Sequence, residues 1–161
     1  MHALEPFEAV VAEHGPVVMR VCRALLGPAD ADDAWSETFL AALRAYPELR
    51  PDSNVRGWLV TIAHRKAIDQ LRARSRRAEP AADVDRRLTG AHPGPEPVDS
   101  ELHGALAGLP DKQRLAVVYR YVADLAYAEI GGLLECSEAA ARRNASDGIA
   151  RLRRLYGKDD S

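Results

Sequence analysis

The sequence predicts an all-α protein of two small helical domains joined by a flexible linker, and three observations support this prediction. Apolar residues recur at helical spacing in each long segment, and no strand pattern of convincing length appears. Residues 78–100 are rich in proline and glycine and poor in apolar residues, so burial cannot offset their ordering entropy. Residues 121–156 show two helical patterns joined by a tight turn, which is typical of a helix-turn-helix. We therefore expect domains at 1–77 and 101–158, with the linker over 78–100.

The first domain opens with two expected helices. One spans Phe7 to Leu26 and ends at Gly27-Pro28. The other spans Asp30 to Tyr46, and acidic side chains crowd its N-terminus, where the helix dipole favours anions. Helical spacing predicts a buried stripe on this second helix, made of Trp35, Phe39, Ala42, Leu43 and Tyr46.

The opposite face of the second helix is acidic, with one leucine at its centre. It carries Asp33, Glu37, Leu40 and Arg44. One interpretation is a solvated surface with a single stray leucine, which is common in proteins. The other interpretation is a docking face for a basic, partly apolar partner.

The third expected helix runs from Asn54 to about Arg77 and is capped by Asp52 or Ser53. One strip of it is polar and mostly basic, with Trp58 close by, and consists of Thr61, Arg65, Asp69, Arg72 and Arg76. Guanidinium groups pair with phosphates and aromatic rings stack on unpaired bases, so this strip suits nucleic acid. The alternative for Trp58 is a plain core tryptophan.

The second domain is expected to begin with helices over Glu101 to Leu109 and Lys112 to Val122, the latter capped by Asp111. The helix-turn-helix follows, and Ser137 is the expected N-cap of its second helix. The outer face of that helix carries Arg142, Arg143, Ser146 and Asp147. Such a helix can enter a major groove, but an ordinary helical hairpin with solvated charges has the same pattern.

Charge is strongly segregated along the chain, although the net charge is only −2. Residues 56–77 carry seven basic groups and one acidic group, and residues 138–158 carry six basic and two acidic groups. Two basic helices in an otherwise acidic chain predict two separate contacts with a polyanion.

Several function classes are disfavoured. No apolar run approaches the length of a membrane span, and no signal-peptide pattern precedes the first helix, so a cytoplasmic protein without membrane contact is expected. Cys22 and Cys136 are far apart and are expected to be small buried hydrophobes, not a disulfide or a metal pair. The histidines are scattered, and no phosphate-binding loop or hydrolase motif is present. We expect no enzyme, no metal and no cofactor.

Three segments, in order, resemble the small bacterial sigma factors of the extracytoplasmic-function group. DADDAWSETFLAALRAY (30–46) resembles the group's DAEDLVQETFLRAWRAL pattern, and VRGWLVTIAHRKAIDQLRARSRR (55–77) resembles RAWLFTIARNLAIDHLRRRRR. The stretch from ALAGLPDKQR to ASDGIARLR (105–153) resembles the group's C-terminal segment. With the first helix, the resemblance covers nearly all of the chain outside the linker.

The resemblance implies a two-domain transcription initiation factor. The first domain would bind the clamp coiled coil of RNA polymerase core and melt the minus-ten promoter element, and the second would read the minus-thirty-five element. The polymerase-binding positions would be Asp33, Ser36, Glu37 and Leu40.

The same resemblance assigns promoter DNA to both basic helices. The minus-ten positions would be Asn54, Trp58, Thr61, Arg65, Arg72 and Arg76, within a helix that ends in the run Arg72–Arg77. The loop from Arg50 to Asn54 would capture a flipped base. The minus-thirty-five positions would be Arg142, Arg143, Ser146 and Asp147. Members of the group are often held inactive by an anti-sigma protein, which is therefore a further candidate partner.

The chain departs from the family pattern at several positions. Ser36 replaces a usual glutamine, and His64-Arg65 stands where Arg-Asn is common. In the last helix, Asp147 and Ile149 stand at basic positions, and Gly148 is a poor helix former. Asp147 lies four residues from Arg143 and from Arg151, so an intrahelical ion-pair ladder is an alternative role for these arginines.

Two alternatives to a sigma factor keep the same fold. The chain could be a stand-alone helix-turn-helix regulator that does not use polymerase. It could also be a sigma-like interaction protein whose DNA-reading helix is weakened. The acidic face of the second helix and the arginines of the last helix discriminate among the three hypotheses.

Overall fold

The structure is a computed structural model that describes residues 4–77 and 97–156, and the described residues contain helices and no strand. The all-α prediction is confirmed. Most of the predicted linker lies outside the described residues, although its last four residues, from Pro97, are helical. In chain order the elements are α1 (Phe7–Leu26), α2 (Pro28–Ala45), the 3-10 helix η1 (Tyr46–Glu48), α3 (Val55–Arg77), α5 (Pro97–Ala107), α6 (Asp111–Val117), the π-helical turn η2 (Val118–Val122), α7 (Tyr127–Leu134) and α8 (Glu138–Tyr156).

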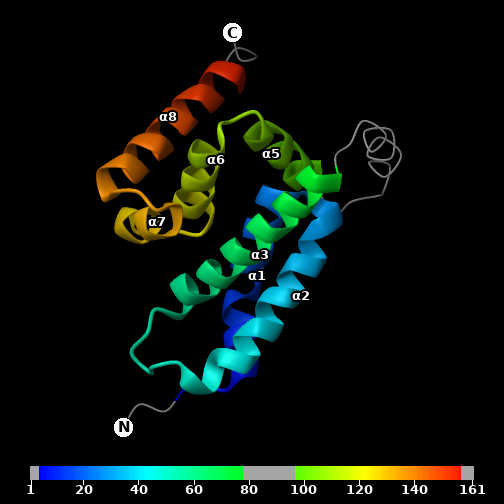
Figure 1. The fold of residues 1–161 in the computed structure, drawn as a ribbon, viewed down its shortest axis with the longest axis vertical. Helices are drawn as coiled ribbons and strands as arrows, with labels where there is room; N and C mark the ends of the chain where they lie inside the picture. The colour runs from blue at the N-terminus through cyan, green and yellow to red at the C-terminus, as the bar shows by residue number, and fades with distance from the viewer. Residues whose placement is uncertain (1–3, 78–96, 157–161) are drawn as a thin grey trace.

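Helices α1, α2 and α3 pack on one another as a bundle (Figure 1). Two polar side chains inside the bundle have backbone partners, as most buried polar groups do. The Trp35 indole N–H donates to the Gly15 carbonyl at 2.9 Å, and the buried Thr38 hydroxyl donates to the Ala34 carbonyl at 2.7 Å. Cys22 is buried here, and burial raises the pKa of its thiol to about 12. Cys22 is therefore a neutral apolar filler, as predicted.

The buried face of α2 differs from the prediction at Leu43, whose side chain is 51% exposed. The buried residues of that face are Ala31, Ala34, Thr38, Phe39 and Ala42, and all but Phe39 are small enough to allow close approach to α1 and α3. Leu43 follows Ala42 by one residue, so it lies about 100° farther round the helix. The stripe prediction was therefore wrong for Leu43, which lies beyond the edge of the buried face.

Two of the three predicted N-caps were wrong. Asn54 caps α3, since its Oδ1 accepts the Gly57 N–H at 3.2 Å, so neither Asp52 nor Ser53 has this role. Asp111 is the first residue of α6, not its cap, and its carboxylate accepts from the Arg114 guanidinium at 2.9 Å. Ser137 does cap α8, because its hydroxyl accepts the Ala140 N–H at 3.0 Å.

The two domains share one continuous core of buried apolar side chains. Helix α5 and the turn η2 both pack against α1. Tyr119 of η2 is fully buried, and its hydroxyl lies 2.5 Å from Nδ1 of His64 on α3. Near the C-terminal end of α1, His103 Nδ1 donates to the Ala24 carbonyl at 3.1 Å. In this structure the helix-turn-helix is therefore docked on the first domain.

The His64–Tyr119 contact predicts a loss of stability in mild acid. Burial, and then the neighbouring Arg65 charge, lower the pKa of His64 below its ordinary value. In the unfolded chain His64 takes up a proton below about pH 6.5, while the folded chain resists protonation. The free energy of unfolding should therefore fall as the pH drops below that value, measured by denaturant titration between about pH 8 and pH 5. His64→Gln, which keeps an acceptor for the Tyr119 hydroxyl, should flatten the dependence, and an equally steep dependence in that variant would contradict the assignment.

Candidate nucleic-acid interface

The predicted minus-ten residues share one face of α3. They follow one another at intervals of three, four or seven residues from Asn54 to Arg76, which places them on one side of a helix. Arg65, Arg72 and Arg76 are exposed, whereas Trp58 and Thr61 are half-buried. Asp69 is also exposed on this strip. The face therefore offers three accessible guanidinium groups to an anion, and its contact with DNA stays a prediction.

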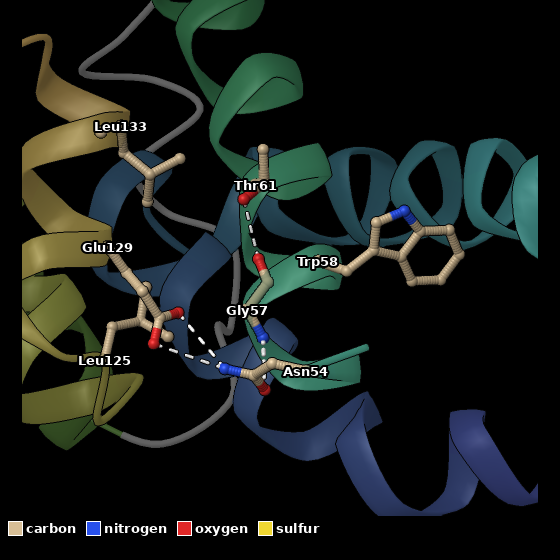
Figure 2. A pocket seen from close by; sticks show the side chains of 8 residues that line it. Asn54, Gly57, Trp58, Thr61, Leu125, Glu129 and Leu133 are labelled. Carbon is tan, nitrogen blue, oxygen red and sulfur yellow. Dashed lines mark hydrogen bonds between the residues drawn. The ribbon is translucent and has the colours of Figure 1, made fainter. Parts of the chain in front are cut away.

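The N-terminal end of this face lies against α7 (Figure 2). Asn54 uses its Oδ1 for the helix cap and donates from Nδ2 to the Glu129 carboxylate, at 3.3 and 3.4 Å. A cavity of about 450 Å³ separates the two helices, lined by Asn54, Gly57, Trp58, Thr61, Leu125, Glu129, Gly132 and Leu133. The Trp58 ring points away from Glu129, and its centroid lies 6.3 Å from that of Tyr46. Much of the indole therefore packs within the first domain.

Arg74, in the basic run at the end of α3, has a structural role. It is half-buried, and its Nε donates to the Asp30 carboxylate at 2.8 Å. Its Nη2 also donates to the Leu26 carbonyl and to Asp30. This contact ties α3 to the junction of α1 and α2. Arg74 is therefore not part of the accessible basic surface. Asp30 has a specific partner in Arg74, whereas the sequence showed it only as one of several acidic residues at a helix N-terminus.

The four predicted minus-thirty-five residues are all exposed on α8. Arg142 is held in place, since its Nη2 lies 3.3 Å from a Glu138 oxygen and its guanidinium lies 4.9 Å from the centre of the Tyr127 ring. Within the described residues, Asp147 forms no ion pair with Arg143 or with Arg151. The ion-pair ladder that the sequence left open does not form.

Gly148 falls on the apolar stripe that helical spacing predicts for this helix, and it is buried where α8 packs against α6. A Cβ at this position would lie 2.6 Å from Val117 Cγ2 and 3.2 Å from the Gln113 carbonyl oxygen. Glycine therefore permits the close crossing of α8 and α6. Ile149 is half-buried beside it. Gly148 and Ile149 therefore face the rest of the domain. Asp147, the third departure from the family pattern, faces solvent.

The geometry predicts that Arg143 contributes more to duplex binding than Arg142. Arg143 is exposed and uncommitted within the described residues, whereas Arg142 already contacts Glu138 and Tyr127. One lost phosphate contact lowers the slope of log K against log salt by about 0.9. We expect that decrease for Arg143→Ala and a smaller one for Arg142→Ala, measured by titrating duplex DNA at several salt concentrations. Equal slopes for the wild type and both variants would show that this face does not bind DNA.

A second exposed face lies on α2. Asp33, Ser36 and Glu37 are exposed there, as are two leucines, Leu40 at 54% and Leu43 at 51%. The leucines are three residues apart and so are neighbours on the helix surface. Sequence reasoning found Leu40 but missed Leu43, although its three-residue spacing from Leu40 was a usable signal. Paired exposed leucines beside carboxylates favour a docking face over a stray apolar residue.

Both halves of the chain match models of one protein family. Residues 10–77 match Sigma-70 region 2, and residues 99–152 match Sigma-70 region 4. The RNA polymerase sigma factor CarQ of Myxococcus xanthus is 34% identical, over 97% of this chain and 92% of its own length. The ECF RNA polymerase sigma factor SigE of Mycolicibacterium smegmatis is 30% identical, over 99% of this chain and 65% of its own. The chain belongs to the extracytoplasmic-function sigma factors.

Solved structures show the same fold. CnrH, solved in complex with the cytosolic domain of CnrY, matches with a TM-score of 0.71 at 24% identity, over 95% of this chain and 88% of its own. The sigma factor RpoE of Bartonella quintana, solved with the anti-sigma factor NepR, matches with a TM-score of 0.74 at 21% identity, over 92% of this chain and 95% of its own. Among the described helices of this sigma factor, none combines the length and apolar character of a membrane span.

Family membership decides between a sigma factor and a stand-alone regulator. Both sigma regions are present and in order, so the chain is a transcription initiation factor that works with RNA polymerase core and promoter DNA. A stand-alone helix-turn-helix regulator would not account for the match over residues 10–77.

Proposed function

We propose that this sigma factor divides its work between a domain at residues 1–77 and a domain at residues 101–158. The first docks polymerase through Asp33, Ser36, Glu37 and Leu40 of α2, and its α3 face engages the minus-ten element. The second reads the minus-thirty-five element with α8. The observation that carries this proposal is the α2 face, where two half-exposed leucines stand beside carboxylates. Such a surface complements a partner that is both basic and apolar.

Base capture is assigned to the loop from Arg50 to Asn54. A cavity of about 350 Å³ lies beside this loop, and Tyr46, Pro51, Val55 and His14 are among the residues that line it. Extruding a base costs a few kcal/mol, which a pocket must offset. Pro51 and Val55 supply apolar contact for that purpose, while Glu5 and Glu13 make the remaining wall polar.

We further propose a role without catalysis or cofactor, carried out where polymerase acts, in the bacterial cytoplasm. An anti-sigma protein is a proposed additional partner, supported by the structural match to RpoE, which was solved with NepR.

Run-off transcription tests the proposed function. Purified polymerase core, this sigma factor and a library of random promoter DNA would be combined, and the transcribed templates sequenced. We expect two enriched motifs at a fixed spacing, one for each domain. Arg142→Ala combined with Arg143→Ala should lose the upstream motif and keep the downstream one. Absence of both core binding and template selection would overturn the proposal.

A further inference from the structure

Two arginines from different elements lie against one aromatic ring, that of Tyr127, the first residue of α7. The guanidinium carbon of Arg120 lies 4.4 Å from the centre of the ring, and that of Arg142 lies 4.9 Å from it. The face of an aromatic ring carries partial negative charge, so it attracts both cations. Arg120 belongs to η2 and Arg142 to α8. The ring therefore joins α7 to the element before it and to the helix after it.

The Tyr127 ring is itself held in place. It is half-buried and packs against the core. Arg120 is also half-buried, and its Nη1 donates to the Leu125 carbonyl at 3.1 Å. A ring with the core on one side and a backbone-anchored cation against it has few conformations available, because protein interiors are closely packed. Tyr127 therefore offers Arg142 a rigid support.

Arg142 is held from a second direction by its own helix. Its Nη2 donates to Glu138 Oε1 at 3.3 Å. An exposed pair of this kind contributes little by itself, but the carboxylate and the Tyr127 ring engage the same guanidinium and restrict it together. The Arg142 side chain is still 57% exposed. A guanidinium carries five N–H donors, so most of them stay available to a ligand.

The neighbouring Arg143 has no such restraint. It is exposed and uncommitted within the described residues. A mobile arginine can follow a phosphate, whereas bidentate recognition of a base edge requires two aligned donors. Arg142 is the fifth residue of α8, in the N-terminal part of the helix, where recognition helices contact base edges. Holding the side chain in advance lowers the entropy that it loses on binding.

We propose that Tyr127 is a positioning residue that presets Arg142 to read a base, while Arg143 contacts phosphate. The group that Arg142 recognises is the major-groove edge of guanine, which offers the N7 and O6 acceptors. This assignment agrees with the smaller salt slope expected for Arg142→Ala, because that slope counts phosphate contacts. The positioning role rests on the function proposed above, since it takes α8 as the reader of the upstream element.

Removing the ring should relax the base preference at one position of the upstream motif. Tyr127→Leu keeps apolar bulk and removes the aromatic face. In run-off selection with polymerase core and random promoter DNA, its preference for guanine at that position should fall by about fivefold or more, from the lower end of the discrimination of a bidentate arginine contact. Arg142→Ala should relax the same position. Tyr127→Phe keeps the ring and should retain the wild-type motif.

The control makes the same substitution at another tyrosine of the domain. Tyr121 lies on η2 and is 58% exposed, and Tyr121→Leu should retain the wild-type motif. Denaturant unfolding of each variant reports any loss of stability, which would lower the use of every template alike and leave the motif unchanged. Wild-type guanine preference in Tyr127→Leu, or the same relaxation in Tyr121→Leu, would overturn the positioning role.

A measurement without DNA separates this inference from the proposed function. The ring current of Tyr127 should shift the NMR resonances of the Arg142 δ-methylene protons upfield. The shift should vanish in Tyr127→Leu and persist in Tyr127→Phe. An unchanged Arg142 resonance in Tyr127→Leu would contradict the contact and with it the positioning role. If the shift vanishes as expected but the wild type selects no upstream motif, α8 is not the reader, and the proposed function fails although the contact exists.

Discussion

Leu40→Ala combined with Leu43→Ala is expected to lower the affinity for polymerase core by roughly thirtyfold or more. Each truncation of an apolar anchor at an interface costs on the order of 1 kcal/mol or more. Both side chains are more than half exposed in the free protein, so they have little packing to lose. The free energy of unfolding should stay within about 0.5 kcal/mol of the wild type, the usual range for surface substitutions. Titration of fluorescent core and denaturant unfolding measure the two quantities.

Leu155→Ala provides the matched control, because Leu155 is 55% exposed near the end of α8 and lies far from α2 along the chain. It should leave core affinity unchanged. If the control and the double variant bind core equally well, α2 is not the docking face. If the double variant is also unstable, lost binding no longer reports docking, and single substitutions at Ser36 and Glu37 become the test.

Gly131→Ala is expected to destabilise the helix-turn-helix by about 1–3 kcal/mol, the usual effect of overpacking a close contact. A Cβ on Gly131 would lie 2.7 Å from the Cys136 carbonyl oxygen and 3.2 Å from the Ser137 carbonyl carbon. Both obstacles are backbone atoms, so no side-chain rotation relieves the clash. The turn would have to move, and with it the Ser137 cap of α8. Denaturant unfolding measures the loss.

The neighbouring glycine should respond in the opposite direction. Gly132 is exposed, and a Cβ there would have no atom outside its own helix backbone and chain neighbours within 4 Å. Gly132→Ala should therefore stabilise α7 by about 0.5–1 kcal/mol, the difference in helix propensity. Equal effects from the two substitutions would mean that helix propensity alone, and not the close approach of the turn, governs Gly131.

The structure changes the expected effect of the unusual middle of α8 on DNA binding. The sequence Asp147-Gly148-Ile149 departs from the family pattern and suggested a weakened reader. Gly148 is buried against α6 and Ile149 is half-buried, so neither would have presented a basic group to DNA here. Only Asp147 adds negative charge to the exposed face. The expected weakening of the reader therefore comes from a single carboxylate.

Local sequence signals predicted the parts of the fold that depend on neighbouring residues. The helix from Phe7 to Leu26 and the cap at Ser137 follow from apolar spacing and one side-chain hydrogen bond within a turn. The cap of α3 was harder to predict, because Asp52, Ser53 and Asn54 are all good caps in a row. The backbone path of the loop selected Asn54.

The sequence by itself determined the all-α class, the segregation of charge and the family, since periodicity, composition and motif order are properties of the chain. It did not predict that α5 begins at Pro97 or that a π-helical turn follows α6. Only the tertiary structure decided which side of each helix is available. Arg74 turns inward to Asp30 while Arg72 stays exposed, and Leu43 faces solvent beside Leu40. It also revealed that Tyr119 joins both domains in one core. These outcomes depend on contacts between residues far apart in the chain, which helical spacing does not encode.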